Sequence, residues 1–292
     1  MSENLSFVPV RSALYVPASN QRAIDKTASI GADWVIFDLE DSVAPETKAS
    51  ARDALRSAFQ RRDFGGSRVA IRCNAVGSDD FISDIETIAA CRPDAVLLPK
   101  VSSVDDVLLY ARQADAVTLP AEIKSWFMIE TASGIAKLGA IIESAASMPW
   151  ALSTLVVGHN DIASETGVSL EHDRRYMVPW LMQIVLQAKL AELQVLDSVW
   201  NNFRDLHGFE NEALQGKQMG FDGKTLIHPS QVEIATRVFS PSVEEVARAR
   251  LIVETFALPE NSQSNVLPID GEMVERLHLL QAQRLLQKAD LV

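Results

Sequence analysis

The sequence of 292 residues predicts a single (β/α)8 barrel, the TIM-barrel class of α/β proteins, followed by a C-terminal helical extension. Eight short apolar runs alternate with amphipathic stretches over about 240 residues, which is the size expected of this fold. The runs are rich in β-branched residues and are apolar without interruption, as is typical of parallel strands buried on both faces. An open, doubly wound parallel sheet is the alternative fold.

The predicted elements follow one another in strict alternation along the chain. The strands are expected at Ala13–Val16, Trp34–Asp38, Val69–Cys73, Ala95–Leu98, Trp126–Glu130, Leu155–Gly158, Val195–Val199 and Thr225–Ile227. The helices between them are expected at Gln21–Ile30, Pro45–Phe59, Phe81–Ala90, Val104–Gln113, Gly134–Ala146, Asp173–Leu193 and Asn211–Met219.

The chain continues beyond the eighth predicted strand. Pro229 opens a helix in its first turn, and a Ser-x-x-Glu box starts a second helix over Ser242–Phe256. The polar stretch Pro259–Asp270 is typical of a linker, and a last helix with one broad apolar face is expected over Glu272–Ala289. We therefore expect a barrel domain over residues 1–257 and a linker with a lid helix over 258–292. The apolar face must pack on the chain's own barrel or on a neighbouring subunit.

The composition excludes several classes of partner. The formal net charge is −12 and no cluster of Lys and Arg is present, which argues against nucleic-acid binding. The longest apolar runs are far shorter than the roughly 20 residues of a membrane span, and the N-terminus lacks a signal sequence. The two cysteines, Cys73 and Cys91, form no metal or disulfide motif, so we expect a protein of the reducing cytoplasm.

Polar side chains gather where the predicted strands end, and these carboxyl ends meet at one rim of a barrel. They are Asp38 to Asp41, Arg72 to Asn74, Lys100, Glu130, His159 to Asp161, Asp197 and His228. Four or five carboxylates so close together would raise one another's pKa values unless a cation lay among them. The crowding therefore indicates a divalent metal ion.

Glu130 and Asp161 are the predicted metal ligands. Both end clean apolar strands, and the two strands are neighbours in the barrel. Two carboxylates without a nearby His or Cys form a hard oxygen site, which suits Mg²⁺, or Mn²⁺, with water and substrate in the remaining positions. The alternative is that Asp161 caps the following helix and Glu130 pairs with a base.

Arg72 ends the third predicted strand, where its planar guanidinium suits a carboxylate or an enolate. An ion pair with Glu40 or Asp41 is an equally good interpretation. Glu40 and Asp41 would contact metal-bound water or orient Arg72. Lys100 is a candidate substrate ligand, and the acidic rim would keep it protonated and therefore unsuited to Schiff-base chemistry.

Several motifs, in this order, resemble the citrate lyase beta-subunit-like group of the HpcH/HpaI aldolase superfamily. The opening carries RSALYVP at Arg11–Pro17 and GADWVIFDLEDSV at Gly31–Val43. The later pieces are IRCN at Ile71–Asn74, LPK at Leu98–Lys100, IET at Ile129–Thr131, GHND at Gly158–Asp161 and GFDGKTLIHPSQ at Gly220–Gln231. Together they cover roughly residues 11–256.

The resemblance implies a trimeric or hexameric barrel that binds Mg²⁺ through Glu130 and Asp161, with Arg72 in the active site. It implies reversible Claisen cleavage of malyl-CoA, citramalyl-CoA or a citryl thioester. Segments matching Arg11, Lys48 and Arg52 would meet the nucleotide of CoA.

Relatives also carry a C-terminal lid whose motif reads Asp-Gly-x-Met-x-Asp and reaches a neighbouring active site. Here the motif ends in Glu275 instead of Asp, and Ala18 replaces the usual Gly after Pro17. Glu275 would protonate the enolate that Arg72 stabilises, since a carboxyl group can serve as a general acid.

Three functions remain open. The first is a CoA-thioester lyase, with citramalyl-CoA ahead of malyl-CoA because the lid motif is present. The second is a citrate lyase beta subunit that acts on a citryl group carried by an acyl carrier protein. The third is a catalytically silent barrel that serves as a binding or scaffold protein, which the intact residues Glu130, Asp161 and Arg72 argue against.

Overall fold

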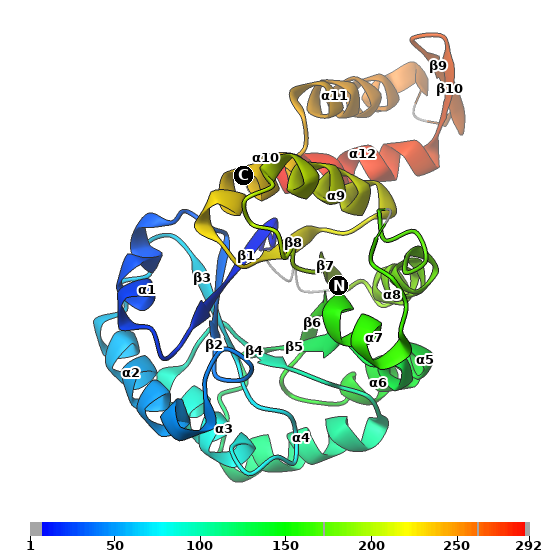
Figure 1. Cartoon of the computed structure of the whole chain (residues 1–292). Coiled ribbons are helices and arrows are strands. Elements are labelled where there is room, and N and C mark those ends of the chain that lie inside the picture. Colours follow the sequence, from blue (N-terminus) through cyan, green and yellow to red (C-terminus); the bar gives the residue numbers. More distant parts are fainter. Residues whose placement is uncertain (1–7, 172, 262, 290–292) are drawn as a thin grey trace. The chain divides into compact units, whose positions relative to one another are not determined.

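A closed barrel of eight parallel strands forms the larger part of the protein. The computed structural model describes residues 8–171, 173–261 and 263–289. The strands pair in chain order, and β8 pairs with β1 to close the barrel (Figure 1). They are β1 (Ser12–Pro17), β2 (Trp34–Asp38), β3 (Arg68–Arg72), β4 (Ala95–Leu98), β5 (Lys124–Ile129), β6 (Leu152–Val157), β7 (Gln194–Asp197) and β8 (Gly223–Leu226). The predicted fold class is confirmed, and the open sheet is wrong.

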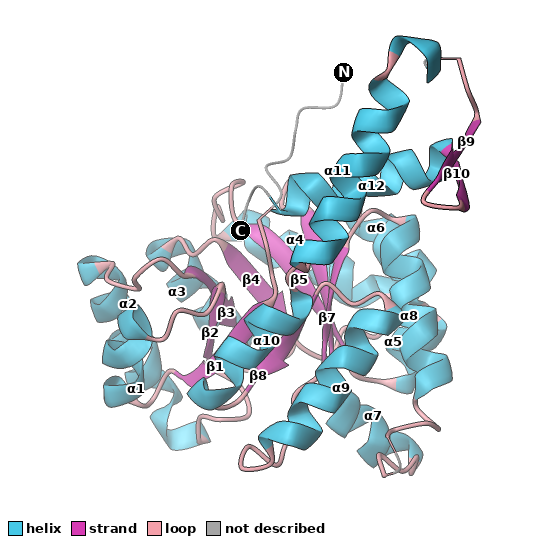
Figure 2. Cartoon of the chain, turned by 90° about the horizontal axis from the view of Figure 1, so that it is seen from above, coloured by secondary structure: helices cyan, strands magenta, loops and turns pink. Residues whose placement is uncertain are grey.

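Helices connect the strands and surround the barrel (Figure 2). They are α1 (Gln21–Lys26), α2 (Lys48–Arg61), α3 (Phe81–Cys91), α4 (Val104–Ala116), α5 (Ala132–Ala136), α6 (Leu138–Ala145), α7 (His159–Thr166), α8 (Val178–Leu190) and α9 (Leu206–Met219). Short 3-10 turns follow α1 at η1 (Thr27–Ser29) and precede α2 at η2 (Pro45–Thr47). After β8 come η3 (Pro229–Gln231) and α10 (Val232–Phe239).

Some helix boundaries differ from the predicted ones. The helix expected over Asp173–Leu193 begins only at α8, because Asp173 and Arg174 have φ values of 59° and 48°, in the left-handed region. The one helix expected over Gly134–Ala146 is divided into α5 and α6. Helix α7, directly after β6, was not among the predicted elements.

The amino ends of β1 and β2 are joined by polar contacts. Arg11 Nε and Nη2 donate to the two carboxylate oxygens of Asp33, at 2.8 and 2.7 Å. The Ser12 hydroxyl accepts the Asp33 N–H at 3.0 Å. Arg11 precedes β1 and Asp33 precedes β2, so both lie at the end of the barrel opposite the carboxyl-terminal rim.

The residues from Val238 onward form a second compact unit, separate from the barrel unit Val10–Arg237. It contains α11 (Val243–Ala257), η4 (Pro259–Asn261), the antiparallel hairpin of β9 (Val266–Ile269) and β10 (Glu272–Glu275), and α12 (Arg276–Ala289). Its own core is built from side chains of α11, the hairpin and α12, which include Ile252, Phe256, Leu267, Ile269 and Val274.

Two expectations for elements of this region are corrected. The stretch Pro259–Asp270 is not only a linker, because it contains β9. The last helix begins at Arg276 and not at Glu272, because Glu272–Glu275 pairs as β10. The division between the units falls at Val238, earlier than the expected boundary after residue 257, because α11 packs within the C-terminal unit.

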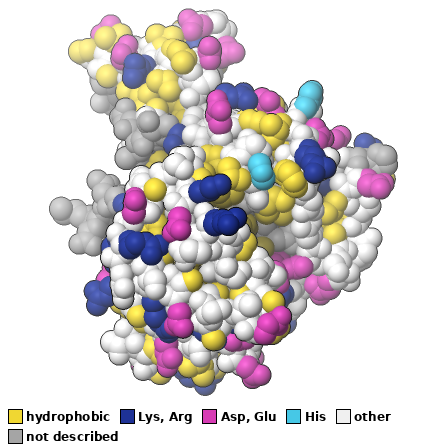
Figure 3. Space-filling model, turned by 60° about the vertical axis from the view of Figure 1, so that its left-hand side comes forward, with side chains coloured by type: hydrophobic (Ala, Val, Ile, Leu, Met, Phe, Trp, Pro, Cys, Tyr) yellow, Lys and Arg dark blue, Asp and Glu magenta, His cyan; other side chains and the backbone are white. Residues whose placement is uncertain are grey.

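The surface carries charges of both signs. On the face that Figure 3 shows, basic side chains lie singly or in small groups among acidic and apolar ones. Over the described parts of the chain, no helix combines the length and the apolar character that a membrane crossing needs.

Candidate active site

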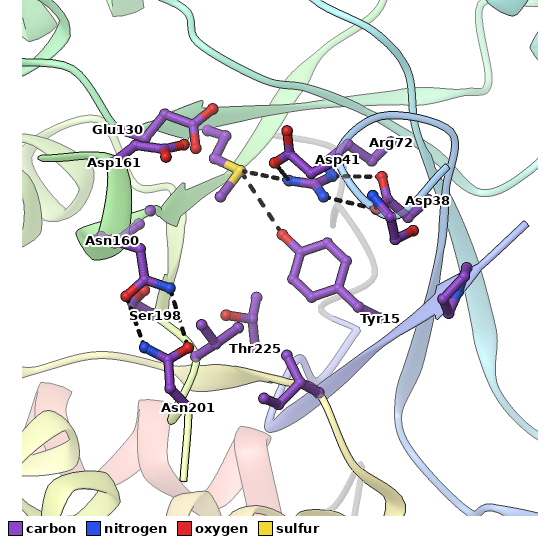
Figure 4. A pocket seen from close by; sticks show the side chains of 17 residues that line it. Tyr15, Asp38, Asp41, Arg72, Glu130, Asn160, Asp161, Ser198, Asn201 and Thr225 are labelled. Atoms are coloured by element: carbon purple, nitrogen blue, oxygen red, sulfur yellow. Dashed lines mark hydrogen bonds and ion pairs between the residues drawn. The ribbon is translucent and has the colours of Figure 1, made fainter. Parts of the chain in front are cut away.

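A cavity of about 440 Å³ lies at the carboxyl ends of the strands (Figure 4). Its lining comes from seven of the eight strands or the residues directly after them, so the barrel itself sets the spacing of these side chains. The polar lining residues are Tyr15, Asp38, Asp41, Ser42, Arg72, Glu130, Asn160, Asp161, Ser198, Asn201 and Thr225.

Glu130 and Asp161 lie side by side in this cavity (Figure 4). Glu130 is 1% exposed. Its Oε1 accepts the Lys100 N–H at 2.7 Å, whereas its Oε2 is buried without a hydrogen-bond partner. Burial, together with the nearby carboxylates of Asp161 and Glu40, raises the pKa of Glu130 to about 9. A cation next to Oε2 would therefore stabilise the ionised form of Glu130.

The two carboxyl groups fit a divalent cation of the Mg²⁺ type. The donor set is oxygen only, and the unpartnered Oε2 is a buried acceptor available to a metal ion. Among the described residues no group of three or more His, Cys, Asp or Glu side chains is placed to hold a metal. Water and substrate would therefore supply the remaining ligands, which is usual for Mg²⁺.

Gly158 allows β6 to approach Glu130 closely. A Cβ at this position would lie 2.5 Å from Glu130 Cβ and 2.6 Å from Oε2. Real Cβ atoms do not make such short contacts, so only glycine fits beside Glu130 without displacing its carboxylate. The glycine directly precedes α7, the helix that carries Asp161 in its first turn.

Asp38 holds the Arg72 side chain. Arg72 Nε and Nη2 donate to the two Asp38 oxygens at 2.7 and 2.8 Å, a bidentate pair between β3 and β2. Burial alone would raise the pKa of Asp38, but these hydrogen bonds outweigh it and lower the pKa. The guanidinium also lies over the Tyr15 ring, 4.9 Å from its centroid. Arg72 is thus both ion-paired and part of the cavity lining.

The third nitrogen of Arg72, Nη1, has weaker partners. It is 3.1 Å from Glu40 Oε2, at an ion-pair distance but without hydrogen-bond geometry, and 3.3 Å from Asp41 Oδ2. Met128 Sδ is 3.9 Å away. Because two nitrogens are occupied by Asp38, Nη1 is the donor best placed to bind a substrate oxygen.

Lys100 belongs to an acidic cluster beside the cavity. Its Nζ donates to Glu40 Oε1 at 2.6 Å and lies 3.7 Å from Asp41 Oδ1. Partial burial would lower the pKa of Lys100, but the contact with Glu40 outweighs it and raises the pKa. Lys100 therefore stays protonated at neutral pH, as expected from the acidic rim, and is a poor Schiff-base nucleophile. Its N–H supports Glu130 directly.

Comparison with known proteins agrees with this arrangement. Residues 11–229 match the family model described as HpcH/HpaI aldolase/citrate lyase. The chain belongs to this family. A (3S)-malyl-CoA thioesterase of Cereibacter sphaeroides is 39% identical over 284 residues, which cover 97% of this chain and 96% of that protein. The mitochondrial citramalyl-CoA lyase of Homo sapiens is 28% identical over 97% of this chain and 86% of its own.

A solved structure extends the similarity. It is the CitE protein of Mycobacterium tuberculosis in complex with magnesium, acetoacetate and coenzyme A. It is 28% identical, with a TM-score of 0.73, and the match covers 97% of this chain and 98% of that one. The resemblance inferred from the motifs is confirmed, and the named relatives are enzymes of CoA esters.

The three side chains predicted to contact the nucleotide of CoA, those of Arg11, Lys48 and Arg52, bind other residues of this chain instead. Arg11 lies at the opposite end of the barrel with Asp33, so its position does not suit that role. Lys48 is buried, and its Nζ contacts the Asn74 amide oxygen and the backbone oxygens of residues 39 and 40. Arg52 pairs with Asp80 and Asp84 on the α3 side, at 3.0 and 2.8 Å. None of the three lines the cavity.

Asp197 also differs from its predicted place at the rim. It is fully buried and faces Gly216 of α9. Arg174, which precedes α8, donates to it through Nη1 and Nη2 at 2.6 and 2.9 Å, and Lys224 of β8 donates through Nζ at 3.0 Å. Burial would raise the pKa of Asp197, but these cations outweigh it and lower the pKa. The rim therefore holds fewer carboxylates than the sequence indicated.

Several lining residues were missed from the sequence. Tyr15 Oη donates to Met128 Sδ at 3.8 Å, and burial raises the pKa of this phenol. The alternation of β1 and β5 could have indicated both as inward-facing residues. Asn160, expected at the rim, exchanges two hydrogen bonds from the first turn of α7 with Asn201 after β7. Asn201 was missed, because the sequence carries no signal for it. His159 and His228 do not line the cavity.

Proposed function

We propose that this protein is a Mg²⁺-dependent enzyme that cleaves the CoA thioester of a 3-hydroxy acid of the malyl or citramalyl type. The products would be acetyl-CoA and a 2-oxo acid. The observation that carries the proposal is the buried, unpartnered Oε2 of Glu130 beside Asp161, in a cavity that Arg72 also lines. The magnesium complex of the M. tuberculosis relative supports the choice of metal.

The chain's residues divide the work as follows. Glu130 and Asp161 would hold the metal, which when bound supplies Lewis acidity toward a substrate hydroxyl and carboxylate. A carboxylate of the rim, for which Asp41 in the cavity lining is the candidate, would accept the hydroxyl proton. The C2–C3 bond would then break, and its electron pair would pass to the thioester as an enolate. Arg72 Nη1 is placed to donate to the enolate oxygen, while Asp38 fixes the guanidinium. Glu275 stays the predicted acid that returns a proton to carbon.

The lining favours a reaction without a covalent protein intermediate. No histidine or cysteine is found among the described residues that line the cavity. A Ser–His or Cys–His nucleophile is therefore absent from that lining. Carbon–carbon cleavage of the proposed kind needs only a metal site, an oxyanion donor and proton transfer.

Hydrolysis of the same thioester is the second candidate. It is favoured by the 39% identity to a (3S)-malyl-CoA thioesterase. Water would then attack the thioester carbonyl, the C–S bond would break, and the free hydroxy acid and CoA would leave. The same carboxylate pair and Arg72 would serve this reaction.

One experiment separates the two reactions. The purified protein is incubated with Mg²⁺ and, in turn, malyl-CoA, citramalyl-CoA and citryl-CoA, and the products are separated by liquid chromatography and mass spectrometry. Acetyl-CoA together with glyoxylate, pyruvate or oxaloacetate supports the lyase. Free CoA together with the intact hydroxy acid supports the thioesterase and contradicts carbon–carbon cleavage. A protein with Arg72→Ala serves as the control for background hydrolysis.

A further inference from the structure

Helix α7 has no cap of its own at its N-terminus. Its N-cap residue is Gly158, which has no side chain and, because of Glu130, has no room for one. The first N–H groups of a helix lack partners within the helix and must find them elsewhere. The way in which this N-terminus is held affects the proposed metal site, because Asp161 lies in the first turn of α7, two residues after His159.

Ser198 supplies the missing acceptor from the neighbouring strand. Its hydroxyl, directly after β7, accepts the His159 N–H at 3.0 Å. Ser198 is 1% exposed, so water does not replace this contact. The bond ties the first residue of α7 to the end of β7.

A second contact joins the same two segments. Asn160 and Asn201 donate to each other's amide oxygens at 3.2 and 2.9 Å (Figure 4). Both side chains are exposed, so water can substitute for these bonds in part. Two consecutive residues of α7 are therefore held by two residues that follow β7.

The end of β7 is itself anchored. The Ser198 N–H donates to Asp197 Oδ1 at 2.8 Å, and the same carboxylate is held by the buried Arg174. Lys224 completes the cluster from β8. A fixed Asp197 thus fixes the backbone of Ser198, on which α7 depends.

We propose that Ser198, supported by Asn201, is a positioning residue that sets the place of Asp161 opposite Glu130 and so determines metal affinity. The inference rests on the proposed function, since it takes Glu130 and Asp161 as the metal ligands. Supporting residues of this kind typically change metal affinity about 10-fold to 100-fold when they are removed.

The test measures metal binding and not turnover. Mn²⁺ binding to the metal-free protein is followed by electron paramagnetic resonance, and Mg²⁺ binding by titration calorimetry. Ser198→Ala is expected to raise both Kd values about 10-fold to 100-fold. Asn201→Ala is expected to raise them less, because its bonds are exposed.

Ser12→Ala is the matched control. The Ser12 hydroxyl is also buried and also accepts a backbone N–H at 3.0 Å, but at the opposite end of the barrel. Because the Ser12 hydroxyl also accepts the Thr236 hydroxyl at 3.0 Å, Ser12→Ala should lower the thermal stability at least as much as Ser198→Ala while leaving the Kd values unchanged. Equal Kd values for Ser198→Ala and wild type, or equal rises for both serine variants, would overturn the positioning role.

A third variant separates the two levels of the proposal. Glu130→Ala should abolish metal binding if the proposed metal site is right. If Glu130→Ala abolishes it and Ser198→Ala leaves it unchanged, only the positioning role fails. If Glu130→Ala binds metal like wild type, the proposed metal site fails and the inference falls with it.

Discussion

Arg72 shows how a single residue can satisfy two interpretations of its sequence context. Its position at the end of β3 indicated either an oxyanion partner or an ion pair. The structure shows the expected ion pairs with Glu40 and Asp41, at 3.1 and 3.3 Å. It adds a shorter, bidentate pair with Asp38, a residue to which no role had been assigned. Asp38 uses two of the three guanidinium nitrogens and leaves Nη1 next to the cavity. Residue type and strand position indicate that an arginine is important, whereas side-chain contacts decide which atom can act.

The planar fork of Arg72 should therefore matter more than its charge. Arg72→Lys is expected to lower kcat about 10²–10³-fold, because lysine can neither match the two Asp38 oxygens nor keep a donor at the position of Nη1. Steady-state kinetics measures the effect. Arg68→Lys, at the exposed other end of the same strand, is the control and should have ordinary kinetics. Near-normal kcat and KM for Arg72→Lys would mean that this residue is only structural.

Glu130 should couple metal binding to proton release. Its raised pKa, about 9, means that the carboxyl group is protonated in the metal-free protein at pH 7 and must lose that proton when metal binds. Titration calorimetry in buffers of different ionisation enthalpy should detect about one proton released per metal at pH 7. Apparent affinity should rise with pH and level off near pH 9. Metal binding at pH 7 without proton release would contradict the protonated carboxyl.

The same shift affects the stability of the metal-free protein. Between the ordinary pKa of 4.5 and the raised value of about 9, the folded state binds a proton at Glu130 that the unfolded state has lost. Stability from this group is fully present below the lower pKa and is lost as pH rises through this window. Thermal unfolding followed from pH 6 to pH 9 should show the decline without Mg²⁺ and a smaller one with it.

At the level of elements, the sequence predicted the eight strands well, because a buried parallel strand has an unmistakable apolar run. It missed α7, since GHNDIASET at Gly158–Thr166 has few apolar residues and no side-chain cap. It also missed the hairpin of β9 and β10, although Asp270-Gly271 is the type of dipeptide that forms tight turns. The hairpin was missed because the apolar pattern of the last helix continues back to Met273, so that β10 was included in the predicted helix.

Gly158 lies between β6 and α7, and the position of the Glu130 carboxylate depends on its lack of a side chain. Gly158→Ala would place a methyl group 2.6 Å from Glu130 Oε2, and the carboxylate would have to move. We expect a loss of metal affinity of about 10-fold or more, with a stability loss of about 1–3 kcal/mol from overpacking. Gly66→Ala is the control, since a Cβ there meets no atom within 4 Å. Unchanged metal affinity in Gly158→Ala would show that Glu130 tolerates displacement.

For the whole molecule, composition and periodicity were enough to predict the barrel and the rim on which its chemistry lies. They were not enough to predict which rim charges face the cavity. Asp197 binds the buried Arg174, and Lys48 binds the amide oxygen of Asn74. The spacing of residues in the sequence does not indicate either contact. In the C-terminal unit, the last helix packs Leu279, Leu285 and Leu286 against the core of that unit.

A hybrid oligomer tests the predicted role of Glu275. Glu275→Gln should leave the fold intact and lower kcat, because an amide cannot transfer the proton. If the lid serves a neighbouring subunit of the expected trimer or hexamer, mixing Glu275→Gln subunits with Arg72→Ala subunits should restore part of the activity. Mass spectrometry must confirm that subunits exchange. Exchange without any recovery would mean that Glu275 acts within its own chain or has no part in the reaction.

The dependence of turnover on the Glu130–Asp161 pair tests the account most directly. Cleavage of the thioester substrate is followed by product formation before and after exhaustive treatment with EDTA, and again after Mg²⁺ or Mn²⁺ is added back. If the two carboxylates hold the metal, chelation should abolish cleavage, either metal should restore it, and Glu130→Ala should show almost no activity under any condition. Full activity after chelation would contradict the metal site and direct attention to Lys100, whose Schiff base borohydride could then trap.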